Sequence, residues 1–190
     1  MLIDQYLTHY DVSEVNCAVV SAAPARAYDL ARHIDLYRVP IIRMLFWLRT
    51  LPERVLRSKA SVQRTRSRTL TIDDIVAPGS GFIVLSESPG EEIVIGAVGR
   101  FWQPRIEFVT TDAADFTGFE TSGYAKLAWH ICVQPYGSER SLVSIEVRVK
   151  AIDEASRRRF RRYWKLIGPV SRWIRQRALT RIVADAVKLK

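Results

Sequence analysis

The chain has 190 residues, of which 48% are hydrophobic and 26% are charged, and its formal net charge is +9. This length and mixture suit one globular domain with a sizeable core. The five Trp, seven Tyr and seven Phe residues exclude a disordered chain, and two cysteines exclude a disulfide framework. The low cysteine content and the polar, acidic N-terminus, which does not resemble a secretory signal, predict a cytoplasmic protein.

Basic charge is concentrated in two segments. Residues 38–68 carry nine Lys or Arg against one acid, and residues 151–190 carry twelve against three. Residues 69–150 are acidic, with eleven Asp or Glu against six Lys or Arg. This asymmetry favours either an anionic contact surface or solvated helix faces. The most apolar window, residues 39–51, is interrupted by charge and too short to span a membrane.

The first third of the chain predicts a strand followed by two short helices. Residues 12–21 are rich in β-branched side chains, with Val15, Cys17 and Val19 on one face of the expected strand. Pro24 suits the first turn of a helix, and apolar residues follow it at helical spacing. A second short helix is expected after Pro40.

From Arg64 onward the pattern predicts an antiparallel meander. Short segments rich in Val, Ile, Phe and Trp are separated by turn residues, and they cover 65–74, 81–88, 91–98, 101–110, 123–133 and 141–149. In the last two segments apolar and polar residues alternate, so we expect one face of the sheet to be buried and the other to be in water. Lys126 and His130 fall on the wet face. The spacing of Gly96 and Gly99 predicts local sheet curvature.

A long C-terminal helix is predicted from Asp153, a good N-cap residue, to the late 180s. Residues placed at 100° steps give an apolar arc that includes Phe160, Trp164 and Ile167, with arginines opposite. Pro169 predicts a kink, because its ring crowds the preceding turn.

This order of elements is that of the helix-grip fold, an α+β fold in which a curved antiparallel sheet wraps around a long C-terminal helix. The stretches 22–28, 99–102, 123–129 and 158–164 carry the resemblance. With them the chain resembles a bacterial branch of the SRPBCC superfamily, which includes START-like lipid-transfer domains and polyketide cyclases. The resemblance implies that residues 1–190 form a single SRPBCC-like domain with a cavity between sheet and helix.

The alternation of side chains supplies candidate lining residues for that cavity. They are Leu127, Trp129, Ile145 and Val147 from the sheet, and Phe160, Trp164 and Ile167 from the helix. Phe101 and Trp102 are adjacent in an expected strand, so only one of them is expected to face inward, and the pattern leaves open which.

An apolar lining without catalytic motifs predicts a binding or carrier module for a hydrophobic small molecule or lipid. The alternative is a polyketide cyclase-like or dehydratase-like enzyme that uses one or two inward ionisable groups in the same cavity. No catalytic residue is assigned and no cofactor is expected. No metal site is expected either, because His9, His33 and His130 show no metal-ligand spacing and Cys132 lies beside His130 on the polar face.

Trp173 falls outside the apolar arc, between Arg172 and Arg175. Together with Trp47 in the first basic segment, it predicts a peripheral contact with an anionic membrane or a partner. If the kink at Pro169 rotates the last turns, Trp173 packs against the early helices instead. The arginines carry no nucleic-acid motif, so nucleic acid is not an expected partner, and the oligomeric state is not predicted.

Overall fold

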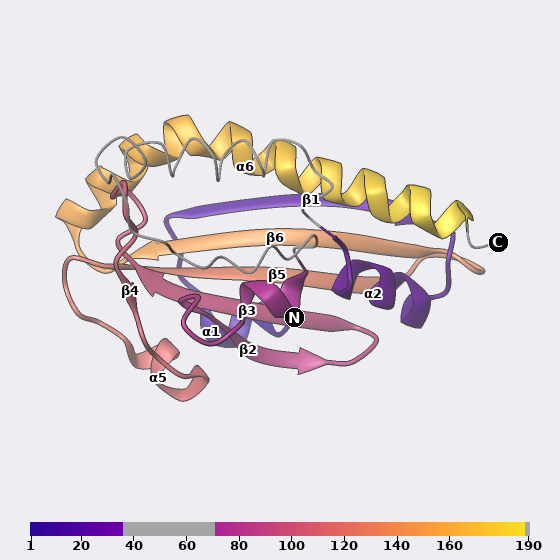
Figure 1. Cartoon of the computed structure of the whole chain (residues 1–190), viewed down its shortest axis with the longest axis horizontal. Helices are drawn as coiled ribbons and strands as arrows, with labels where there is room; N and C mark the ends of the chain where they lie inside the picture. The colour runs from indigo at the N-terminus through magenta and orange to yellow at the C-terminus, as the bar shows by residue number, and fades with distance from the viewer. Residues whose placement is uncertain (36–70, 189–190) are drawn as a thin grey trace, which may run out of the picture.

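The computed structural model describes residues 1–35 and 71–188, which have an α+β architecture (Figure 1). Six strands form one antiparallel sheet in the order β1-β6-β5-β3-β2, with β4 paired to β3 outside this path. The strands are β1 (Val12–Val20), β2 (Phe82–Ser88), β3 (Glu92–Gly99), β4 (Phe108–Val109), β5 (Ala125–Pro135) and β6 (Ser141–Ala151). The helices are α1 (Ile3–Tyr6), α2 (Pro24–Arg32), α4 (Ile72–Ile75), α5 (Ala113–Gly118) and α6 (Glu154–Lys188).

A strand was predicted over residues 65–74, but residues 71–74, the part that the structure describes, lead into helix α4 instead. The Thr71 hydroxyl accepts a hydrogen bond from the Asp74 amide, and the Asp74 carboxylate accepts one from the Thr71 amide. This capping box satisfies backbone amides at the start of a helix, so the local chemistry favours a helical turn. Residues 65–70, like the helix predicted after Pro40, lie outside the described residues.

The segment 101–110 forms a strand only at its end, in β4, whereas residues 101–105 form turns and bends. Pro104 has no amide hydrogen and would leave a gap in a strand ladder. Phe101 and Trp102 therefore lie in a turn that follows β3, not in a strand.

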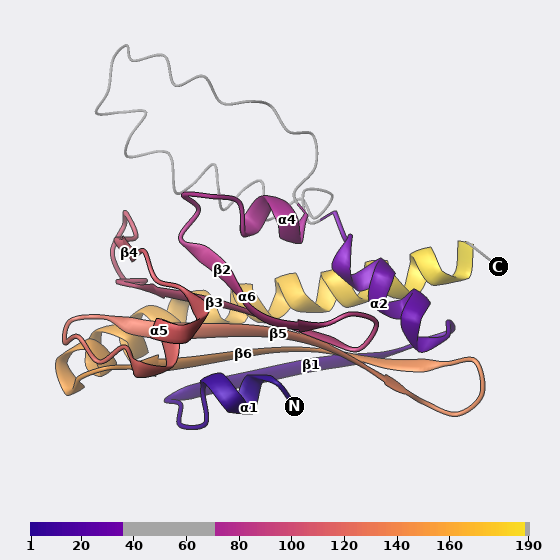
Figure 2. The same ribbon diagram turned by 90° about the horizontal axis from the view of Figure 1, so that it is seen from below.

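Helices cover both faces of the sheet. Helices α2 and α6 pack on one face, which we call the inner face, and α1 and α5 pack on the opposite, outer face. Figure 2 shows α1 and α2 on opposite sides of the strands. Helix α6 contacts mainly β1, β6 and α2, so it runs along the β1 side of the inner face (Figure 1).

Two apolar clusters fill the inner face. One cluster, called the α2 cluster below, combines α2, the C-terminal half of α6 and the adjoining strand residues. Its buried members include Ala27, Tyr28, Ala31, Ile131, Val133, Val143, Ile145, Ala178, Leu179 and Ile182. The second cluster lies under the N-terminal half of α6 and holds most of the predicted lining residues.

The outer face of β5 and β6 is largely covered, and the expectation that this face is in water was wrong. Lys126 is 4% exposed and His130 is 1% exposed. The side chains that cover them come from α1, α5 and the strands, and form a third cluster of Ile3, Leu7, Leu85, Val94, Val98, Phe116 and Ala128. Helix α1 has four residues and α5 has six, which is too short to display a helical period in the sequence.

Gly96 provides the space that one of these side chains needs. A Cβ atom at Gly96 would lie 2.7 Å from Cδ1 of Leu85, which sits at a register shift in β2. The glycine thus allows Leu85 to pack directly on the neighbouring strand.

Helix α6 begins where the sequence predicts. Asp153 accepts hydrogen bonds from the amide of Ser156 (2.9 Å) and the amide of Gly123 (2.6 Å). These backbone hydrogen bonds, together with one from the Ser156 hydroxyl, lower the pKa of Asp153 to about 2. The helix continues through Pro169 to Lys188. One side chain therefore caps α6 and ties it to the loop before β5.

Asp153→Ala is expected to lower the free energy of unfolding at pH 7 by about 1–2 kcal/mol, because it removes the cap and leaves two amides without an acceptor. The folded-state pKa of about 2 lies below the value of about 3.9 for an unfolded aspartate. The contribution is therefore complete above about pH 4 and disappears as the pH falls toward 2.

Urea unfolding of both proteins at several pH values tests this prediction. Glu154→Ala is the control, since Glu154 pairs only with arginines on the surface and its loss should cost less than about 0.5 kcal/mol. A difference between wild type and Asp153→Ala that does not shrink in acid would contradict the assigned role.

Candidate functional site

Seven of the nine predicted lining residues meet in one cluster on the inner face. This aromatic cluster consists of Phe101, Trp102, Leu127, Trp129, Val147, Phe160 and Trp164. The rings of Phe160 and Trp164 are stacked with their centroids 5.5 Å apart. Phe101 is buried and Trp102 is half-buried, which shows that Phe101 is the more inward of the pair.

The other two predicted lining residues lie nearby. Ile145 is buried, but it belongs to the α2 cluster. Ile167 is half-buried on α6, beside Gly168. Gly168 has a packing role, because a Cβ atom there would come within 2.9 Å of Nε1 of Trp164. The glycine therefore lets the Trp164 indole lie along its own helix.

The polar face of β5 is more deeply buried than its apolar face, which is the reverse of the prediction. Leu127 and Trp129, on the apolar inner face, are only half-buried. Their neighbours Lys126 and His130, on the polar outer face, are buried. The apolar face is thus the more accessible one at the centre of this strand.

A polar contact joins α6 to the edge strand β1. Glu14 accepts a hydrogen bond from Nε1 of Trp164 (3.2 Å). Its carboxylate also forms an ion pair with the guanidinium of Arg175. Arg175 also donates to Asn16 (2.9 Å) and to Ser171 (2.6 Å). Burial lowers the pKa of Arg175 from its usual value, although the charge of Glu14 opposes this shift.

The prediction that Arg175 faces a membrane or partner is wrong, because Arg175 is only 4% exposed and its guanidinium contacts Glu14 and Asn16 of β1. Glu14 and Asn16 occupy the inner face of β1, while Val15 and Val19 are 56% and 39% exposed on the outer face. An apolar pattern does not locate a buried ion pair, so the sequence placed this arginine in solvent.

Trp173 packs against the α2 cluster. This agrees with the alternative prediction that it packs against the early helices and does not face a membrane. The guanidinium of Arg177 lies 5.0 Å from the centre of its ring. Arg172 remains exposed, with its Nε 3.5 Å from Glu14. Trp47 lies outside the described residues. Trp173, predicted as an aromatic anchor for an anionic membrane, is therefore half-buried against the core.

A groove of about 380 Å³ lies beside this interface, between β1 and the last turns of α6. Its lining comprises Asn16, Cys17, Ala18, Gln176, Leu179, Thr180 and Val183. It borders the α2 cluster through Leu179 and includes none of the predicted lining residues.

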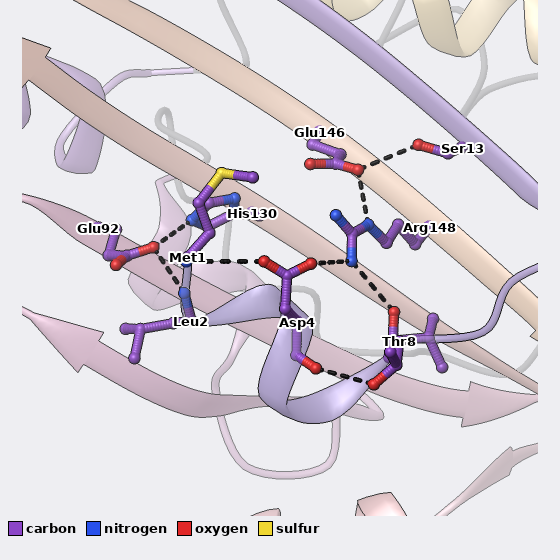
Figure 3. A network of polar contacts seen from close by, with 10 residues as sticks. Met1, Leu2, Asp4, Thr8, Ser13, Glu92, His130, Glu146 and Arg148 are labelled. Atoms are coloured by element: carbon purple, nitrogen blue, oxygen red, sulfur yellow. Dashed lines mark hydrogen bonds and ion pairs between the residues drawn. The ribbon is translucent and has the colours of Figure 1, made fainter.

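The outer face holds a buried polar network (Figure 3). Arg148 donates to Glu146 (2.6 Å), to Asp4 (2.7 Å) and to the carbonyl of Leu7 (3.1 Å). Glu146 also accepts from the Ser13 hydroxyl (3.0 Å). Both Glu146 and Arg148 are 6% exposed, so this is an ion pair of the interior that links α1 to β6.

A second polar group lies beside this network. Nε2 of His130 is 2.8 Å from Oε2 of Glu92, which also accepts from the Leu2 amide (2.9 Å). Burial lowers the pKa of His130, against the opposing effect of Glu92. Cys132 lies directly opposite Glu92 in the pairing of β5 with β3, and burial and the charge of Glu92 raise the pKa of its thiol.

These three side chains offer metal-ligand atoms that all lie within 4.8 Å of one another. The expectation of no metal site rested on the spacing between histidines and on the position of Cys132 beside His130 on a polar face, without a third ligand. The useful signal was the alternation that puts His130 and Cys132 on one face of β5. The third group, Glu92, comes from β3, and only the strand register brings it to them.

Two comparisons with known proteins return no match. No protein-family model fits the chain, and a search of the curated proteins finds none similar to it. Within residues 1–35 and 71–188, no helix is both long and apolar enough to cross a bilayer.

Arg148→Ala is expected to lower the free energy of unfolding by about 3–5 kcal/mol, because it leaves the buried carboxylate of Glu146 without its partner. The double variant Glu146→Met/Arg148→Met should be more stable than this single variant, since it removes both charges. Chemical denaturation measures both. A loss below about 1 kcal/mol in Arg148→Ala would mean that the pair behaves as a surface salt bridge.

Proposed function

We propose that this chain is a helix-grip protein of the SRPBCC kind, and that it binds a hydrophobic small molecule or lipid on the inner face of its sheet. The α+β architecture, with a six-stranded antiparallel sheet and a C-terminal helix of 35 residues, supports this proposal. The aromatic cluster is the binding surface. It lies between the middle strands and the N-terminal half of α6.

One observation carries the proposal: the inner face is apolar but not sealed. Leu127, Trp129, Trp102 and Trp164 are all half-buried, although they pack against a buried core. Among residues 1–35 and 71–188, helix α6 makes its main contacts with β1 and β6 and not with β5. An apolar ligand that covers these side chains gains about 25 cal/mol for each Å² removed from water.

The arrangement also indicates the chemical class of the ligand. The surface presents the half-buried indole rings of Trp102, Trp129 and Trp164 above buried phenyl rings. The indole N–H of Trp164 already donates to Glu14. These groups favour a ligand whose bound part is largely hydrocarbon, such as an acyl chain or a fused ring system.

The cyclase-like or dehydratase-like alternative needs ionisable groups that are free to move protons. On the inner face Glu14 is paired with Arg175, and the hydroxyl of Tyr28 donates to Glu87 (2.6 Å). Burial and the contact with Glu87 raise the pKa of Tyr28 well above its usual value. These paired groups support binding over proton transfer.

The test is titration with the fluorescent fatty acid cis-parinaric acid. The wild-type protein should bind it saturably, and Trp129→Ala should raise the Kd roughly tenfold or more, because covering a large apolar side chain contributes about 1.5–3 kcal/mol. Leu127→Glu should weaken binding further, since it places a charge on the apolar surface.

Trp173→Ala is the matched control, as it removes an indole from the inner side of α6 outside the aromatic cluster. Its affinity should stay within about twofold of wild type. Non-saturable binding by the wild type, or the same Kd in Trp129→Ala, would overturn the proposal. Circular dichroism verifies that each variant is folded.

A further inference from the structure

The side chains of Glu92, His130 and Cys132 lie on the outer face, across the sheet from the proposed ligand surface. They bring one carboxylate, one imidazole and one thiol within 4.8 Å of one another. His130 is 1% exposed and Cys132 is 6% exposed, and the side chain of Glu92 is 17% exposed. Figure 3 shows His130 and Glu92 beside the first residues of the chain.

The backbone holds these three positions firmly. His130 and Cys132 are two residues apart on β5, so their side chains leave the same face of the strand. Glu92 is the direct partner of Cys132 on β3, and β6 flanks the other side of β5. Metal-binding side chains on the central strands of a sheet are positioned more precisely than those on loops.

The ligand set indicates which metal ions it suits. Imidazole, thiolate and carboxylate are the groups that bind Zn²⁺, in a tetrahedral arrangement. Thiolate and imidazole do not suit Mg²⁺ or Ca²⁺, which prefer oxygen ligands. Three protein ligands leave a fourth position for water or an external ligand.

The distances are close to those of such a site. Two ligands of one tetrahedral Zn²⁺ lie about 3.3 Å apart for nitrogen and oxygen, and about 3.6 Å apart for nitrogen and sulfur. The His130–Glu92 separation is 2.8 Å, and the other ligand atoms lie within 4.8 Å. To reach these separations, the His130–Glu92 pair would move apart by about 0.5 Å, and the other pairs would approach by at most about 1.2 Å.

The charges around the cluster also favour a cation. Three carboxylates gather here, those of Asp4, Glu92 and Glu146. The facing cations are the guanidinium of Arg148 and the amine of Met1, which lies 3.6 Å from Asp4. Arg148 pairs with Asp4 and Glu146, and the Met1 amine pairs with Asp4. The charge of Arg148 also reaches His130, and that of the amine reaches Cys132. The three carboxylates still outnumber the two cations, and a divalent ion at Glu92 would balance the remaining negative charge.

We propose that Glu92, His130 and Cys132 bind a divalent transition-metal ion, with Zn²⁺ as the best fit. The site is separate from the aromatic cluster and does not depend on the function proposed for it. Binding of the metal deprotonates the Cys132 thiol, and the proton passes to solvent, so the affinity rises with pH. Without a metal the same residues would form only a buried His–Glu hydrogen bond beside a thiol.

The experiment uses Co²⁺ as a spectroscopic substitute for Zn²⁺, with protein purified without a histidine tag. Titration should give a near-ultraviolet sulfur-to-cobalt charge-transfer band and visible tetrahedral bands that saturate at one ion per chain. Zn²⁺ should then displace the Co²⁺ and bleach the bands. A wild-type protein that shows no charge-transfer band overturns the proposal directly.

The two cysteines provide a matched pair of variants. Cys132→Ser should abolish the charge-transfer band, whereas Cys17→Ser, at an exposed position of β1, should retain it. Glu92→Gln and His130→Gln should each weaken Co²⁺ binding at least tenfold, with His33→Gln, on the surface, as control. A band that survives Cys132→Ser, or is lost in Cys17→Ser, would contradict the assignment.

Discussion

The pairing of β5 with β6 is the constraint on which the other features depend. Each strand has eleven residues, and the register joins Ala125 to Ala151 and Pro135 to Ser141 without a break. Because side chains alternate along a strand, this register fixes which groups reach each face. A shift of one residue would put His130 on the inner face and Trp129 on the outer face.

The hairpin produces two faces with different chemistry. The inner face offers aromatic and aliphatic side chains that are not fully covered, which suits a hydrophobic ligand. The outer face buries an ion pair, Glu146–Arg148, and the group formed by Glu92, His130 and Cys132. Helix α1 is needed for this second arrangement, since Asp4 and the Leu7 carbonyl accept from Arg148 and the Leu2 amide donates to Glu92. Burying these polar groups without such partners would cost several kcal/mol.

Much of this organisation follows from the sequence. The alternation in β5 and β6 predicts the hairpin, Asp153 predicts the start of α6, and the aromatic residues at matching positions predict the cluster. These signals are strong because they repeat over many residues. The strand predicted over 65–74 was wrong for the described residues 71–74, because the Thr71–Asp74 capping box favours a helical turn.

The outer face was harder to predict for a physical reason. A helix of four residues, such as α1, has one turn and therefore shows no helical period in the sequence. The sequence pattern for that reason did not predict that α1 would cover His130. The contact of His130 with Glu92 joins residues 38 positions apart, and only the register of β3 and β5 brings them together. Arg175 was placed in solvent because its partner Glu14 lies at the other end of the sequence.

The central claim, that an apolar ligand binds the inner face, can be tested residue by residue. The most direct measurement is the set of indole N–H signals in a ¹H–¹⁵N NMR spectrum, recorded while oleate is added. The account predicts that the signals of Trp129, Trp102 and Trp164 shift and saturate, and that the signal of Trp173 stays in place. Uniform shifts of all of them, or no shift at Trp129, would contradict it.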